Sequence, residues 1–343
     1  MRILRCLTVS TLATTILACD HTAPFTTADY ASTTPLVPGN PARLTYDTGT
    51  DSRPSWLPDG SAFLYTQEQI GRSDDDRCLA VMPKTGGTII RTICTNTDAA
   101  GDTLNNFESP AVSTTGQMAY VRTSVLANVN RVTPDYGALV LATYTAPLST
   151  TVLEPLSYFA FGHSVDMVAD LAWVSPSALL FVAEQLSYPC ANLGCTRVDT
   201  VVTGLDVERI DVTSGGSVIT LVTGTGQATS LAAGGPDTIY YTVAGDAGVH
   251  RRLLTTSADT VVFTFGAVPT DVTVAGNLMA VVVGSDLHVV NLQSGTDTPI
   301  TMAFTHLHHP ALSPDRHLLV AEVAAIDSVG AEAPPDLWLW SFP

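Results

Sequence analysis

The sequence has little charge and almost no lysine. Of its 343 residues 14% are charged, and Lys84 is the single lysine. So small a charged fraction argues against intrinsic disorder and against a coiled coil. Hydrophobic residues make up 45% of the chain, which is enough for a large core. Thr, Val, Ala and Gly dominate, and no long helical pattern is present. The composition therefore predicts an all-β protein.

The sequence also lacks the common catalytic motifs. It contains no GxSxG elbow, no HExxH, no P-loop and no GxGxxG after a strand, and each of these has a recognisable spacing. The Gly-Thr-Gly at 224–226 indicates only a turn. We therefore expect a protein that is not an enzyme and needs no cofactor.

The N-terminal apolar run is too short to cross a membrane. A spanning helix needs about 20 apolar residues, but the run that follows Arg2 and Arg5 ends at Ala18. A positive start and a short apolar stretch predict a signal peptide over residues 1–18. Residues 16–19, ILAC, resemble a bacterial lipobox, which implies cleavage before Cys19 and its lipidation. An ordinary signal peptide followed by a chance cysteine is the alternative.

The charge balance excludes one class of partner. Removing residues 1–18 deletes two arginines and no acid, so the formal net charge changes from −17 to −19. Such a surface repels nucleic acid and anionic lipid. We expect a monomer that contacts the membrane through its lipid anchor and does not bind nucleic acid.

Four cysteines remain once those in the signal peptide and the lipobox are set aside. An even number in an exported chain favours disulfides. Cys78 and Cys94 flank a hairpin that turns at residues 84–87, and Cys190 and Cys195 enclose a small loop. We predict these two local disulfides. A four-cysteine metal site would lack any CxxC pair.

Residues 19–40 are rich in Thr, Ala and Pro without an apolar period, which predicts a tether. Residues 41–343 are predicted to form one domain. That domain begins with PARLTY at 41–46, an isolated strand.

A repeated unit organises this domain. Residues 53–65, RPSWLPDGSAFLY, combine a short strand ending in Trp56, a turn at residues 58–60 and an alternating apolar strand. Weaker copies recur to the C-terminus. The six units are 53–65, 109–121, 170–183, 229–242, 271–283 and 309–323.

The spacing of the units predicts the fold. With Trp56, Val112, Trp173, Leu231, Val272 and Leu312 as equivalent markers, the intervals are 56, 61, 58, 41 and 40 residues. About 40 residues build one four-stranded propeller blade. We predict a six-bladed β-propeller of four-stranded antiparallel blades. The strand at 41–46 would join the one at 336–342 and close the last blade.

The repeat also resembles a known family. RPSWLPDGSAFLYT is similar to the PD40 (WD40-like) repeat of TolB-like six-bladed propellers, and Trp56 and residues 58–60 match its pattern. Residues 313–315 match as well, but Arg316 replaces the glycine. The resemblance implies a bacterial envelope protein facing the periplasm or the cell exterior, with a protein or peptide as its partner.

Polar residues directly before each innermost strand should ring one mouth of the central channel. We expect Arg53, Glu108, Asp170, Asp271 and His309 there. Loops from every blade converge at such a mouth, so these residues form a candidate ligand-binding funnel. The alternative is that they only solvate the entrance.

Two further groups of residues are candidate metal ligands. Asp74, Asp75 and Asp76 could hold Ca²⁺, but they lack the alternating spacing of a calcium loop. The histidines at 306, 308, 309 and 317 invite a zinc interpretation. His306 and His308 could share a face of a strand, but no third ligand is evident nearby. We therefore assign no metal site.

The sequence thus favours a lipid-anchored propeller that binds or scaffolds an envelope protein or peptide. The alternative is a hydrolase or lyase acting on glycans or peptides. That activity would need two carboxylates at a set separation, and the candidates are Glu108, Asp170 and Asp271.

The lipid anchor can be tested directly. Cys19→Ser should move the protein from the membrane fraction to the soluble fraction, because the acylated sulfur is lost. Fractionation followed by immunoblotting measures this, with Cys6→Ser as the matched control. A Cys19→Ser protein that stays in the membrane fraction would contradict the lipidation.

Overall fold

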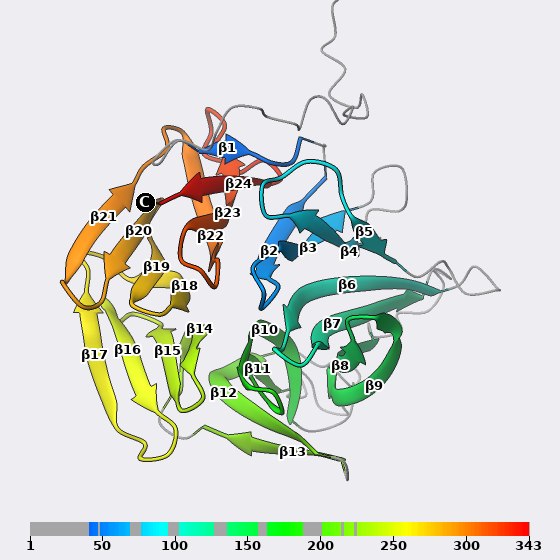
Figure 1. Cartoon of the computed structure of the whole chain (residues 1–343). Helices are drawn as coiled ribbons and strands as arrows, with labels where there is room; N and C mark the ends of the chain where they lie inside the picture. The colour runs from blue at the N-terminus through cyan, green and yellow to red at the C-terminus, as the bar shows by residue number, and fades with distance from the viewer. Residues whose placement is uncertain are drawn as a thin grey trace, which may run out of the picture.

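The chain forms a ring of six antiparallel sheets (Figure 1). The computed structural model describes residues 41–46, 49–68, 77–94, 103–126, 136–156, 163–187, 201–213, 216–222 and 225–342. Within these ranges every sheet has four strands and no helix is present, which confirms the six-bladed β-propeller. No helix in the described part of the chain could cross a membrane.

The first three blades follow the order of the chain, with the first strand of each lying nearest the axis (Figure 1). Blade 1 contains β2 (Asp51–Trp56), β3 (Ala62–Glu68), β4 (Arg77–Pro83) and β5 (Arg91–Ile93). Blade 2 contains β6 (Thr103–Val112), β7 (Gln117–Leu126), β8 (Tyr136–Thr143) and β9 (Ala146–Leu156). Blade 3 contains β10 (His163–Ser175), β11 (Ala178–Ser187), β12 (Val201–Thr213) and β13 (Gly216–Leu221).

The last three blades complete the ring. Blade 4 contains β14 (Ala228–Gly235), β15 (Thr238–Val243), β16 (Gly248–Leu253) and β17 (Asp259–Thr264). Blade 5 contains β18 (Pro269–Ala275), β19 (Leu278–Val283), β20 (Asp286–Asn291) and β21 (Thr296–Ile300). Blade 6 contains β22 (Thr305–Leu312), β23 (Leu318–Ala325), β24 (Asp336–Ser341) and β1 (Ala42–Arg43).

Blade 6 joins the two ends of the chain. β1 pairs antiparallel with β24, so the predicted closure by the N-terminal strand is confirmed. Next to this pair, the Leu44 N–H donates to Leu337 O at 2.7 Å, and the Leu337 N–H donates to Thr45 Oγ1 at 2.9 Å. Both edges of β24 are therefore hydrogen-bonded, and the seam is closed by backbone groups together with the Thr45 hydroxyl.

The core lies between the blades. Six apolar clusters each combine side chains from two neighbouring blades. In β3, Phe63 and Tyr65 face blade 6, whereas Ala62 and Leu64 face blade 2. Because successive strand residues point to opposite faces, a strand buried on both faces must be apolar throughout. This explains the continuous apolar run at the start of β3.

The register corrects two of the repeat markers. Trp56 lies opposite Phe63 in blade 1. The equivalent residues are Ala233 in blade 4 and Val274 in blade 5. Leu231 and Val272 were therefore assigned two positions too early. The turns differ in length among blades, and aligning the repeats by their turns shifted the register.

Two tryptophans link adjacent blades. The Trp56 Nε1–H donates to Ala311 O of blade 6 at 2.8 Å. The Trp173 Nε1–H donates to Ala111 O of blade 2 at 3.2 Å. Trp56 is 8% exposed and packs among residues of both blades. It combines apolar packing with a hydrogen bond at the seam.

Substituting Trp56 separates these two contributions. Trp56→Ala should lower the free energy of unfolding by about 3–5 kcal/mol through cavity formation. Trp56→Phe should cost about 1–3 kcal/mol, because the buried Ala311 carbonyl loses its donor. Urea unfolding measures both. Equal losses for the two variants would contradict the packing argument.

Candidate functional site

Six equivalent residues face the axis of the ring. Each inner strand has a register shift relative to its neighbour, as at Ser52/Ser55 in blade 1. The axial residue lies within the shift in five blades, and in blade 4 Ser230 directly follows it. A bulge re-aims one side chain. The residues at this point, which we call the axial ring, are Arg53, Ser109, Asp170, Ser230, Asp271 and His309.

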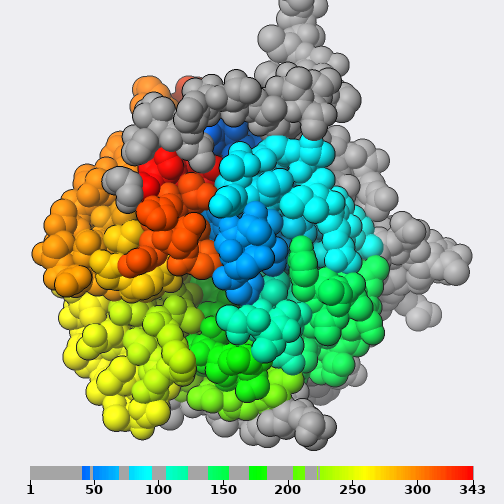
Figure 2. Space-filling view, viewed as in Figure 1, coloured from blue at the N-terminus to red at the C-terminus, as the bar shows by residue number. Residues whose placement is uncertain are grey.

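The axial ring lines a central cavity of about 850 Å³. Figure 2 shows the hollow at the centre of the six blades. The next residue in each inner strand is apolar and lines the cavity too: Pro54, Pro110, Leu171, Leu231, Val272 and Pro310. The turns after the inner strands, such as those with Thr114 and Pro236, complete the wall. A polar ring thus adjoins an apolar one.

Four of the five residues expected at the funnel belong to the axial ring. The exception is Glu108, which does not line the cavity. Its carboxylate accepts a hydrogen bond from Arg77 Nη1 at 2.7 Å. The bulge of blade 2 begins directly after Glu108. The next residue, Ser109, therefore faces the axis in place of Glu108.

The sequence prediction missed Ser230, which occupies the axial ring in blade 4. The shifted repeat register hid it. Ser230 directly precedes Leu231, as Asp170 precedes Leu171, and this local similarity could have revealed its position.

Ion pairs link residues of the axial ring. Arg53 Nη1 of blade 1 lies 3.5 Å from Asp170 Oδ1 of blade 3, across a blade whose axial residue is the small Ser109. On the opposite side, His309 Nε2 lies 3.7 Å from Asp271 Oδ1. These pairs form a charged floor for the cavity.

A buried carboxylate lies behind this floor. Glu322 of β23 is 4% exposed, and its Oε1 lies 2.7 Å from His309 Nδ1. The same oxygen accepts a hydrogen bond from the Arg53 N–H at 2.6 Å. Glu322 is not among the residues predicted from the sequence, although it is the one acid in the apolar strand Leu318–Ala325.

The environment shifts the pKa values of three of these groups. Burial raises the pKa of Asp170, although Arg53 and His309 act in the opposite direction. Burial alone would lower the pKa of His309, but Glu322 and Asp271 outweigh it and raise that pKa to about 9. Burial opposes ionisation of Glu322, yet His309 and Arg53 lower its pKa. At neutral pH His309 and Glu322 form a charged pair.

Axial side chains also join neighbouring blades. Asp170 Oδ2 accepts from the Leu231 N–H at 3.1 Å, and Ser230 Oγ accepts from the Val272 N–H at 3.0 Å. Asp271 Oδ2 accepts from the His309 N–H at 3.3 Å. The carboxylates therefore have fixed orientations, and their other oxygens form the ion pairs with Arg53 and His309.

Four axial residues have a strained backbone. Arg53, Ser109, Asp170 and His309 have φ values between 40° and 52°. Residues other than glycine rarely adopt this left-handed backbone conformation, because it costs about 1–3 kcal/mol for each residue. The same strain in four blades shows that the fold holds these side chains toward the axis.

The remaining candidates lie elsewhere. Cys78 and Cys94 are joined by a disulfide across β4 and the end of β5, with Cα atoms 4.9 Å apart. Cys19, Cys190, Cys195 and residues 74–76 lie outside the described residues.

The four histidines of the sixth repeat unit and its flank separate into three environments. His309 belongs to the axial ring. His306 and His308 lie next to Glu332, a residue that the sequence analysis did not consider. His317 is exposed and lies in the turn between β22 and β23, with its Nδ1 3.4 Å from Phe342 O.

Comparison by sequence identifies no relative. No protein-family model and no curated protein matches the chain. The described propeller nevertheless superposes on solved structures.

A luciferin-regenerating enzyme has a TM-score of 0.55 at 12% identity, covering 88% of this chain and 96% of that one. Oligogalacturonate lyase from Vibrio parahaemolyticus has a TM-score of 0.52 at 11% identity, covering 91% and 95%. TolB from Acinetobacter baumannii has a TM-score of 0.50 at 12% identity, covering 85% of this chain and 64% of TolB. These similarities support the propeller fold alone, because enzymes and other proteins share it.

The buried pair behind the cavity floor gives a stability prediction. Glu322→Gln should lower the free energy of unfolding by about 3 kcal/mol or more at neutral pH, the effect of breaking a buried ion pair. Glu108→Gln is the matched control, because its pair with Arg77 is partly exposed and should contribute less than about 1 kcal/mol. Chemical unfolding measures both. Equal effects would contradict the assigned role of Glu322.

Proposed function

We propose that this chain is a non-catalytic binding module of the bacterial cell envelope, anchored by a lipid on Cys19. Its central cavity would take an extended segment of a partner protein or peptide. The observation that carries the proposal is the cavity of about 850 Å³ with a floor of oriented charges.

The dimensions of the cavity support this function. Ligand pockets are typically about 300–1,000 Å³, with mostly apolar walls and a few placed polar groups. Here residues such as Pro54 and Leu171 supply apolar wall, and the axial ring supplies groups of both signs. A peptide carries amide donors and acceptors together with apolar side chains, so it complements both rings.

Backbone strain is a second support. Left-handed residues other than glycine concentrate at functional sites, because the surrounding structure must hold them. Four of the six axial residues have this conformation. A ring that only solvated an entrance would not require it.

The proposed location rests on other features. The N-terminal pattern predicts export and lipidation, and the Cys78–Cys94 disulfide suits an oxidising compartment. TolB from Acinetobacter baumannii has a similar fold. The PD40-like residues of this chain resemble the repeat of TolB-like propellers, which supports a location in the envelope.

A hydrolase or lyase is the second candidate function. Burial raises the pKa of Asp170, while Asp271 lines the same cavity. Two carboxyl groups in different environments can act as acid and base. Both carboxylates, however, already bond to backbone N–H groups of the next blade, which favours a binding role.

Site-specific photocrosslinking in intact cells tests the binding function. A benzophenone side chain at Thr114, on the cavity wall, should give a discrete adduct with the partner. The same group at Thr256, which is exposed and outside the cavity, should give none. Asp170→Asn combined with Asp271→Asn should reduce the Thr114 adduct about tenfold, because a charged hydrogen bond contributes about 1.5–3 kcal/mol. Glu108→Gln should leave the adduct unchanged.

Two results would contradict the proposal. Identical adducts from Thr114 and Thr256 would show that the cavity is not the site. Turnover of a glycan or peptide substrate that Asp170→Asn abolishes would establish the second function instead.

A further inference from the structure

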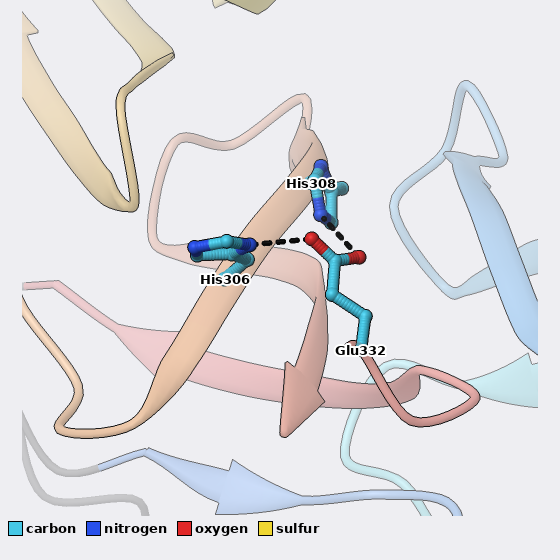
Figure 3. A group of neighbouring side chains, drawn as sticks. All are labelled: His306, His308 and Glu332. Carbon is cyan, nitrogen blue, oxygen red and sulfur yellow. Dashed lines mark hydrogen bonds and ion pairs between the residues drawn. The ribbon is translucent and has the colours of Figure 1, made fainter. Parts of the chain in front are cut away.

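Three side chains meet beside the axial ring. His306 and His308 lie two residues apart in β22, so both point to one face of blade 6. Glu332 reaches them from the segment between β23 and β24 (Figure 3). One carboxylate oxygen pairs with His306 Nδ1, and the other lies 3.3 Å from His308 Nε2.

The separations match those of a metal site. One ligand atom from each side chain can be chosen so that all three lie within 4.8 Å of one another. Two ligands of a zinc ion bonded at about 2.0–2.2 Å lie at most about 4.4 Å apart. Small rotations of the side chains would therefore bring all three ligand atoms onto one ion.

We propose that His306, His308 and Glu332 bind a divalent transition metal ion such as Zn²⁺. Two imidazole nitrogens and one carboxylate form a ligand set that zinc favours. Ca²⁺ and Mg²⁺ prefer oxygen ligands, so they fit this set poorly.

The environment of His308 supports coordination. Its Nε2 is shielded from solvent, and the Glu332 carboxylate faces it with Oε2 3.3 Å away. A metal ion between this nitrogen and the carboxylate could bond to both. On the other side of the ring, Nδ1 lies 3.9 Å from Asp271 Oδ2. Histidine ligands often have a carboxylate facing the second nitrogen.

A simple ion pair explains the cluster less well. The three side chains are between 33% and 42% exposed to solvent. Ion pairs between side chains this exposed contribute little to stability. The backbone already positions them, since His306 and His308 share β22 and Glu332 forms a β-bridge with Ile326. A metal ion would fix Glu332 to β22 and so join the segment before β24 to the inner strand.

The metal site has consequences independent of the proposed peptide binding. Three protein ligands leave a coordination position open for water or for a ligand. Through Asp271 the ion would also adjoin the cavity floor.

Isothermal titration calorimetry with ZnCl₂ tests the site on the full chain, prepared without a polyhistidine tag. One ion per chain should bind. His306→Gln, His308→Gln and Glu332→Gln should each weaken binding at least tenfold, because each removes a ligand. His317→Gln is the matched control, since this exposed histidine of blade 6 lies outside the cluster, and it should change the affinity less than twofold. CaCl₂ should give no comparable binding.

A second measurement keeps the test decisive if one variant folds poorly. Zn²⁺ should raise the unfolding temperature of the unaltered chain and of His317→Gln, but not that of Glu332→Gln. The proposal is overturned if the unaltered chain does not bind Zn²⁺. It is also overturned if the double variant His306→Gln/His308→Gln binds Zn²⁺ as tightly as the unaltered chain.

Discussion

The stacking of apolar faces between neighbouring blades is the interaction on which the rest of the structure depends. Each middle strand is buried on both sides, as Phe63 and Leu64 show by packing toward different blades. A single blade therefore cannot bury its own faces, and the stack must continue until it closes. Closure places the first and last segments of the chain in one sheet, where β1 covers the edge that β24 would otherwise expose. The fold is consequently cooperative around the whole ring, with Trp56 at the seam between blades 6 and 1.

Closure of the ring also creates the candidate site. Six inner strands converge on one axis, and the register shift in each lies at or next to the side chain that faces it. The charges that result need partners, and the ring supplies them across and between blades. Arg53 meets Asp170 over the small Ser109, and His309 meets Asp271 of the neighbouring blade. The same groups that join the blades therefore form the floor of the cavity, which couples any ligand bound there to the assembly of the ring.

Much of this could be predicted from the sequence, and the errors have physical causes. The PDG turn of the first repeat and its weaker copies predicted six blades and their closure, because turn chemistry and strand alternation are local properties. Glu108 was misplaced by one residue because a bulge interrupts the alternation. Ser230 was missed because turns of different length shifted the repeat register. Glu332 was missed because it lies far along the chain from His308 and belongs to no strand of the repeat.

The sequence by itself determined the strand pattern, the number of blades and the pairing of the chain ends, since each follows from short-range periodicity repeated six times. Only the tertiary structure decided which polar side chains meet. The contact of Glu322 with Arg53 joins residues from the first and last blades. The contact of Glu332 with His306 joins a loop to an inner strand. Such contacts depend on the radius of the ring and on the position of each bulge. No local pattern encodes either of these, because both arise only when all six blades have packed together.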